Sequence, residues 1–176
     1  VDDISRLPHL SAAIALLRDG FHEESIGGTV ELNDAGAPLL DYPVSEHLLD
    51  GARRSHLTMA EMHFAAGAKR VRVGHADASF VGSWKEAKAH IEQAPYAPGY
   101  VGLGSAHVMG GCALGSDERL CVTDSDGRFK QLDNLYVFDG SLFPTSLGVN
   151  PQLTIYGMTA KNATALAAKL KPESAA

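Results

Sequence analysis

The stretch Ser105–Gly115, SAHVMGGCALG, limits the fold most, because its three glycines disfavour a regular helix or strand. A loop this flexible has to be held by the elements on either side of it. Glycine lets a backbone come within contact distance of a flat ligand. A neutral imidazole beside such a ligand can accept a proton near neutral pH. His107 in this loop is therefore the first candidate catalytic residue.

Periodicity and turn-forming residues predict the flanking elements. They are a helix over 10–17, a hairpin over 27–44 turning at Asn33–Gly36, a long helix from Glu46 that ends before Gly67, a strand over 69–75, a helix opened by a Ser83/Glu86 capping box, a buried strand over 135–140, and a final helix with Asn150 as its cap and Pro151 at its first position.

Composition narrows the function classes. The chain has 176 residues, 45% hydrophobic and 20% charged, with a net charge of -6 and no basic stripe, so nucleic acid is not an expected partner. No apolar run is long enough to span a membrane, and no signal peptide opens the chain, so we expect a cytoplasmic protein. Because it starts without Met inside an amphipathic pattern, we expect a piece of a longer chain.

The cysteines and histidines outside the loop predict no metal site. Cys112 and Cys121 have no metal-ligand spacing, and reduced, packed thiols are expected. His56 and His63 are seven residues apart, beyond the one-turn spacing of a helical zinc pair. A hydrolase that uses Cys112 would need a thiol of depressed pKa, and nothing near it suggests one.

Three features of the last 70 residues belong together: His107 in its loop, Asp139 and Gly140 at the end of a strand, and the helix entry at Asn150 and Pro151. A helix start offers backbone N–H donors and partial positive charge, and an electron-rich oxygen would sit well there. The stretch GLGSAH fails as a dinucleotide fingerprint, because His107 holds the third glycine position and no strand precedes it.

These motifs resemble the C-terminal region of the GMC oxidoreductases, the glucose-methanol-choline family of FAD enzymes, and are closest to its cholesterol oxidase branch. The resemblance joins SAHVMGGCALG to LDNLYVFDGSLFPTSLGVNPQLTIYGMTAKNATALA in the same order. It implies an α+β fold, in which helices pack on an antiparallel sheet and a C-terminal strand and helix complete an FAD-binding domain. Residues 1–106 would be part of a substrate-binding domain and 107–176 the catalytic and FAD-contacting segment.

The resemblance also implies roles for single residues. His107 matches the active-site histidine that takes the proton of an alcohol while a hydride passes to flavin, and Asn150 would hydrogen-bond the same oxygen. Asp139 and Gly140 match the turn that meets the FAD ribityl chain and pyrophosphate. Asn150, Pro151 and Gln152 form the helix entry, where the Gln152 N–H matches the donor facing the flavin pyrimidine oxygen.

Departures from the family leave a second hypothesis open. The N-terminal FAD-binding Rossmann unit is absent from these residues, so we expect a flavin domain on the same or another chain. The resemblance also implies an apolar or bulky alcohol as substrate. The pocket glutamate of the cholesterol oxidases has no match. The alternative is a non-catalytic domain that keeps the fold and binds a small ligand or a partner.

Overall fold

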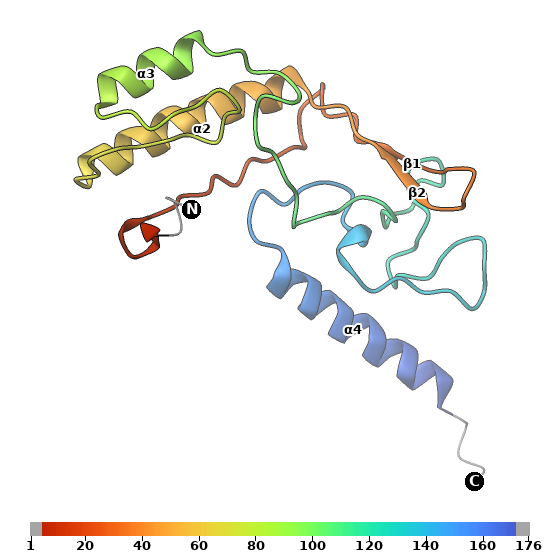
Figure 1. Cartoon of the computed structure of the whole chain (residues 1–176). Coiled ribbons are helices and arrows are strands. Elements are labelled where there is room, and N and C mark those ends of the chain that lie inside the picture. The colour runs from red at the N-terminus through yellow and green to blue at the C-terminus, as the bar shows by residue number, and fades with distance from the viewer. Residues whose placement is uncertain (1–4, 172–176) are drawn as a thin grey trace. The chain divides into compact units, whose positions relative to one another are not determined.

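The computed structural model describes residues 5–171, which form two compact units. The first unit joins the described residues up to Leu17 with Val44–Leu103, and the second joins Arg18–Pro43 with the described residues from Gly104 on. The elements run in the order η1 (Leu7–His9), β1 (Thr29–Leu32), β2 (Pro38–Asp41), α2 (Glu46–Ala65), α3 (Trp84–Gln93), η2 (Gly140–Leu142) and α4 (Gln152–Leu170) (Figure 1). The three helices and the antiparallel hairpin agree with the expected α+β class.

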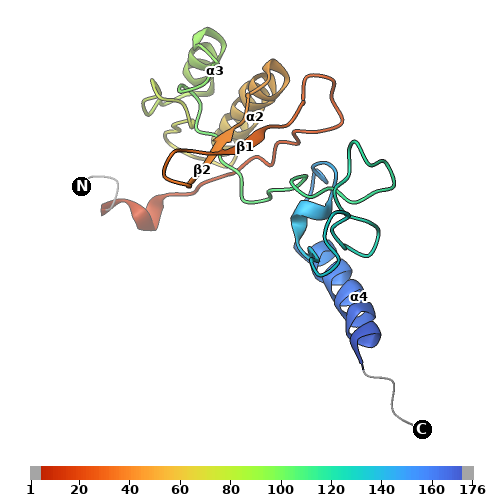
Figure 2. The same cartoon turned by 90° about the vertical axis from the view of Figure 1, so that its right-hand side faces the viewer.

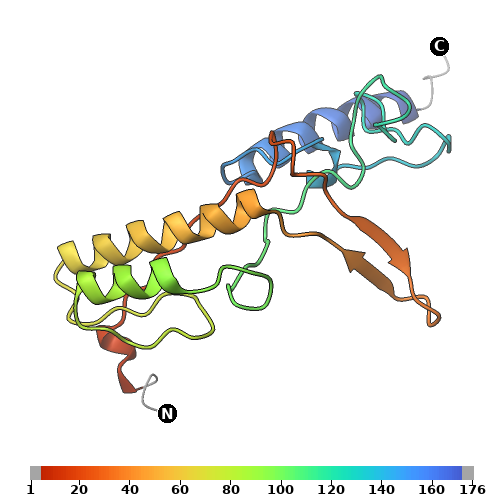
Figure 3. The same cartoon turned by 90° about the horizontal axis from the view of Figure 1, so that it is seen from above.

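Helices α2 and α3 lie side by side and build the first unit (Figure 1, Figure 3). The hydroxyl of Ser45 accepts the N–H of Leu48 at 3.2 Å and so caps α2. One half of the predicted capping box of α3 is present, because the Ser83 hydroxyl accepts the Glu86 N–H at 3.2 Å. The Glu86 carboxylate in turn accepts the Gly82 N–H at 3.0 Å. Both predicted helices are confirmed, since each carries its start signal in its own sequence.

The core of the first unit lies between these two helices. Its buried apolar members are Leu49, Ala52, Ala60, Val71, Ala87, Ile91 and Tyr96. Those of α2, together with the buried His56, follow one another at steps of three or four residues, which is the spacing of one helix face. The strand predicted over 69–75 is wrong in extent, because only isolated bridges form, between Val71 and Val81 and between His75 and Val101.

Two buried histidines, His56 and His75, belong to the first unit. The Nδ1 of His56 shares a hydrogen bond of 2.8 Å with the Tyr96 hydroxyl. His75 makes two hydrogen bonds: its Nε2–H donates to the Pro95 carbonyl at 2.8 Å, and its Nδ1 accepts the Asp77 N–H at 3.2 Å. Burial and the neighbouring His75 lower the pKa of His56, and burial raises the pKa of Tyr96 to about 12.

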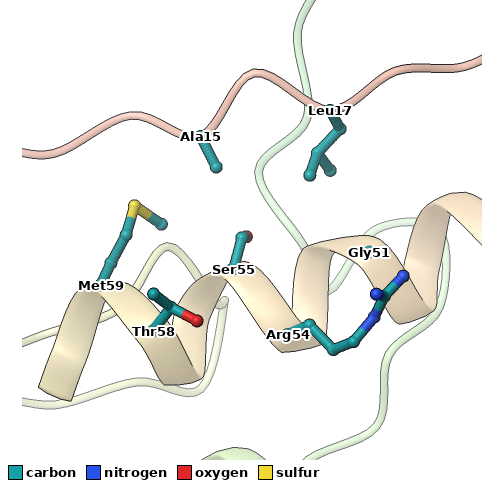
Figure 4. Close-up of a pocket in the computed structure, with 7 residues that line it drawn as sticks. All are labelled: Ala15, Leu17, Gly51, Arg54, Ser55, Thr58 and Met59. Atoms are coloured by element: carbon teal, nitrogen blue, oxygen red, sulfur yellow. The ribbon is translucent and has the colours of Figure 1, made fainter.

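The helix predicted over 10–17 is wrong, because this segment is extended along α2. Ala13, Ala15 and Leu17 are half-buried while the residues between them are exposed, which is the period of two of an extended chain. Figure 4 shows Ala15 and Leu17 pointing toward α2 across a cavity. The contacts of alternate side chains with α2 therefore outweigh the local helix propensity of Ala and Leu.

The second unit contains the predicted hairpin (Figure 2). Strands β1 and β2 pair antiparallel, with Val30 opposite Leu40. The Asn33 carboxamide oxygen accepts the N–H groups of Ala35 and Ala37, both at 3.0 Å, and so closes the turn. Every residue of both strands is exposed.

The strand predicted over 135–140 is also wrong, because the segment makes only an isolated bridge, between Tyr136 and Arg128. Its position is set instead by single contacts. The Val137 N–H donates to the Gly127 carbonyl at 2.8 Å, and the Thr159 hydroxyl of α4 donates to the Phe138 carbonyl at 2.8 Å. No helix of the described residues is long and apolar enough to cross a membrane.

The buried His56 predicts that acid weakens the first unit. Its pKa is lowered in the folded state, so below about pH 6.5 the unfolded chain binds more protons and stability falls. Stability is fully present above that pH and is lost as pH falls toward the folded pKa. Urea unfolding of the chain between pH 8 and 5 should show this decline. His56→Gln should flatten it, whereas His63→Gln, on the same helix but outside the buried core, should not.

Candidate functional site

His107 and Asn150 meet in the second unit although 43 residues separate them. The Asn150 amide nitrogen lies 3.3 Å from the His107 Nε2 and can donate to it when the imidazole carries its proton on Nδ1. His107 is half-buried and Asn150 is exposed. The structure therefore brings together the two residues predicted to handle the substrate oxygen.

Helix α4 begins one residue later than predicted. Its N-cap position is held by Pro151, helix residues start at Gln152, and no side chain caps the first turn. The prediction that Asn150 caps this helix is wrong, because its amide lies at His107 instead. Pro151 has no N–H, so the backbone N–H groups of Gln152 and Leu153 stand at the open first turn. The Gln152 side chain donates to the Tyr156 hydroxyl at 2.6 Å.

Asp139 and Gly140 form a tight turn into η2. The Asp139 carboxylate accepts the N–H of Ser141 at 2.8 Å and also its hydroxyl, through the same oxygen. The aspartate is exposed and the glycine is buried. One carboxylate oxygen thus holds the turn, while the other has no protein partner recorded among the described residues.

Gly140 is the point where the three predicted features touch. A Cβ at this position would lie 3.1 Å from the Ile155 side chain of α4 and 3.1 Å from the carbonyl of Val108. Val108 directly follows His107 in the chain. Only a residue without a side chain allows the segment 135–140, the histidine loop and helix α4 to approach this closely.

The remainder of the histidine loop is tied to the same turn by backbone bonds. The Cys112 N–H donates to the Ser141 carbonyl at 3.0 Å, and the Leu114 N–H donates to the Leu142 carbonyl at 2.9 Å. The Thr123 hydroxyl, which is fully buried, donates to the Cys112 carbonyl at 3.0 Å. Cys112 and Cys121 are half-buried free thiols.

The arrangement offers a proton acceptor, a neutral hydrogen-bond donor and a helix N-terminus, on residues that one turn holds together. It suits an oxygen that loses a proton beside a ligand that gains negative charge. Within residues 5–171 no group of three or more His, Cys, Asp or Glu side chains could hold a metal ion.

A cavity of about 330 Å³ lies elsewhere, in the first unit. Ala15, Leu17, Gly51, Arg54, Ser55, Thr58 and Met59 line it (Figure 4). None of the predicted site residues is among them. This cavity and the candidate site are therefore separate features.

Sequence analysis missed one contact beside the site. The side chain of Arg18 lies against Gly148, two residues before Asn150, so that a Cβ at Gly148 would be 2.6 Å from the arginine Cδ. The two residues are 130 positions apart in the sequence, and no local pattern signals their contact.

A family model described as GMC oxidoreductase matches residues 24–159, more than half of the chain. The match contains His107, Asp139, Gly140, Asn150 and Gln152. The chain therefore belongs to the GMC oxidoreductase family, as its motifs had indicated.

Named relatives agree with this assignment. An uncharacterized GMC-type oxidoreductase of Mycobacterium tuberculosis is 30% identical over 135 residues, 77% of this chain and 21% of that protein. A cholesterol oxidase of Acinetobacter baumannii is 43% identical over 65 residues, covering 37% of this chain and 12% of that protein. A 6'''-hydroxyparomomycin C oxidase of Streptomyces lividus is 40% identical over 73 residues, 42% of this chain and 13% of that protein. The chain spans only about a fifth or less of their lengths.

The contacts of Gly140 give a prediction with a built-in control. Gly140→Ala should destabilise the chain by about 1–3 kcal/mol, because the added methyl presses on a backbone carbonyl and on Ile155. Gly157→Ala, on α4, meets nothing within 4 Å and should stabilise by roughly 0.5–1 kcal/mol through helix propensity. Urea unfolding of the two variants measures both values, and equal effects would contradict the close approach at Gly140.

Proposed function

We propose that this chain is the C-terminal part of an FAD-dependent GMC-type enzyme that oxidises an alcohol. The observation that carries the proposal is the pairing of His107 with Asn150 at 3.3 Å. Residues 1–106 would contribute to the substrate-binding domain, and residues 107–176 would supply the catalytic and FAD-contacting segment. The relatives whose names state an oxidase activity support the reaction class, and the substrate is proposed to be an apolar or bulky alcohol.

His107 would act as the general base. An alcohol oxygen about 2.9 Å from both nitrogens would replace the direct hydrogen bond between them. In that position the alcohol hydroxyl gives its proton to the His107 Nε2, and the Asn150 N–H donates to the same oxygen. As the carbon–oxygen double bond forms, the oxygen loses its proton and the adjacent carbon loses hydrogen with an electron pair. The Asn150 contact keeps the oxygen in line with the base.

The chain's residues fit one edge of an isoalloxazine ring and the linker of FAD. When bound, FAD supplies the acceptor for the electron pair and hydrogen that leave the alcohol carbon. The exposed N–H groups at Gln152 and Leu153, on a helix start that no side chain caps, are suited to a ring edge that gains negative charge. The second carboxylate oxygen of the exposed Asp139 would accept hydrogen bonds from hydroxyl groups of the linker.

The function requires a flavin domain, on the same or another chain, and is tested on that assembly. Purified with all that accompanies it, the assembly should show an FAD absorbance spectrum that one member of an alcohol panel bleaches without oxygen. His107→Ala should slow the bleaching about 10²–10⁴-fold while FAD stays bound, because the base is gone. Asn150→Ala should slow it less, because one hydrogen bond to the oxygen is lost.

His9→Ala, at an exposed histidine of the first unit, is the matched control and should leave the rate unchanged. An assembly that holds no flavin would overturn the proposal and favour the non-catalytic ligand- or partner-binding alternative. Unchanged bleaching in His107→Ala would remove the histidine from the mechanism.

A further inference from the structure

A second segment of the chain packs on the loop that carries Asn150. At Gly20 a Cβ would lie only 2.3 Å from the Thr145 hydroxyl and 3.3 Å from the Ser146 nitrogen. Arg18 continues the contact along the same loop, with its Cδ, Cγ and Nη1 all near the Cβ position of Gly148. The turn that begins at Arg18 therefore contacts the loop before Asn150 at two points.

This turn is strained and is held in place from several sides. Phe21 has φ 54°, in the left-handed region that aromatic residues rarely adopt, and it is 74% exposed. Burial of the ring therefore does not compensate for the backbone strain. Instead, the Arg18 guanidinium lies over the ring, 5.1 Å from its centroid. Asp19 anchors the turn by accepting hydrogen bonds from the hydroxyls of Ser25, at 2.5 Å, and Tyr42.

The residues directly before Asn150 are exposed and bend at a glycine. Gly148 adopts φ 73°, which glycine takes at no steric cost, so its own sequence does not restrict the bend. Val149 is 63% exposed, and the next buried residue is Pro151. The stem of Arg18 lies against this bend.

We propose that Arg18 is a positioning residue for Asn150: its stem packs on Gly148 and keeps the amide at His107, while its guanidinium on Phe21 holds the stem there. Arg18 would act through the loop, because its stem lies against Gly148. The inference rests on the proposed function for its effect on the reaction, but its structural claim stands apart from that chemistry. Misplacement of a reacting group by about 1 Å can cost up to a hundredfold in rate.

Two variants test the contact that the stem makes. Arg18→Ala removes the contact with Gly148, whereas Arg18→Lys keeps the Cγ and Cδ that make it. In the flavin-containing assembly, Arg18→Ala should lower kcat roughly tenfold with little change in KM and with flavin still bound, and Arg18→Lys should recover most of it. Arg119→Ala is the control, because this exposed arginine pairs locally with Asp117.

The structural claim has its own measurement. In the isotopically labelled chain, a nuclear Overhauser effect between the Asn150 side-chain amide and the His107 ring reports their contact. It should be lost in Arg18→Ala and kept in Arg18→Lys and Arg119→Ala, with unfolding by urea confirming that each variant is folded. If Arg18→Ala keeps the effect, or the lysine variant loses it as well, the positioning role is wrong. Because this readout needs no turnover, it still decides the matter if the assembly proves inactive on alcohols.

Discussion

The close approach at Gly140 is the constraint on which the candidate site depends. Ile155 of α4 and the Val108 carbonyl both come within 3.1 Å of where a Cβ would stand. One missing side chain thereby brings together a loop without regular structure, a strand-like segment without a ladder, and the start of a long helix. Backbone hydrogen bonds from Cys112 and Leu114 to η2 secure the same junction. The geometry of the candidate site thus rests on backbone contacts more than on a large apolar core.

The helices could be predicted from sequence where their signals are local. Ser45 and Ser83 each stand directly before a helix and cap it, as the patterns indicated. The helix predicted over 10–17 is wrong because local helix propensity is weak, and contacts with α2 favour an extended chain. The strands predicted over 69–75 and 135–140 are wrong for another reason. A strand needs a partner in register, and here each finds only isolated bridges.

The candidate site shows the same division between local and long-range information. Residue type and spacing pointed to His107, Asp139, Gly140 and the helix entry, but no pattern could state that an amide 43 residues away lies at the imidazole. The one-residue error at the helix start has the same origin. An asparagine before proline is a good cap by local rules, yet its amide is used at His107. Arg18 was missed because its role depends entirely on a contact across 130 residues.

Because the candidate site is exposed, the proposed chemistry needs an assembly that covers it and not this chain by itself. Asn150, Asp139 and Gln152 are exposed, and Leu153 beside them is 83% exposed. Water at these positions would compete for the base and weaken each hydrogen bond to the reacting oxygen. A surface that covers the helix start would exclude that water and place an electron acceptor against the N–H groups of Gln152 and Leu153. On the proposed function, the flavin domain does both, so proton handling lies on this chain and electron acceptance on its covering partner.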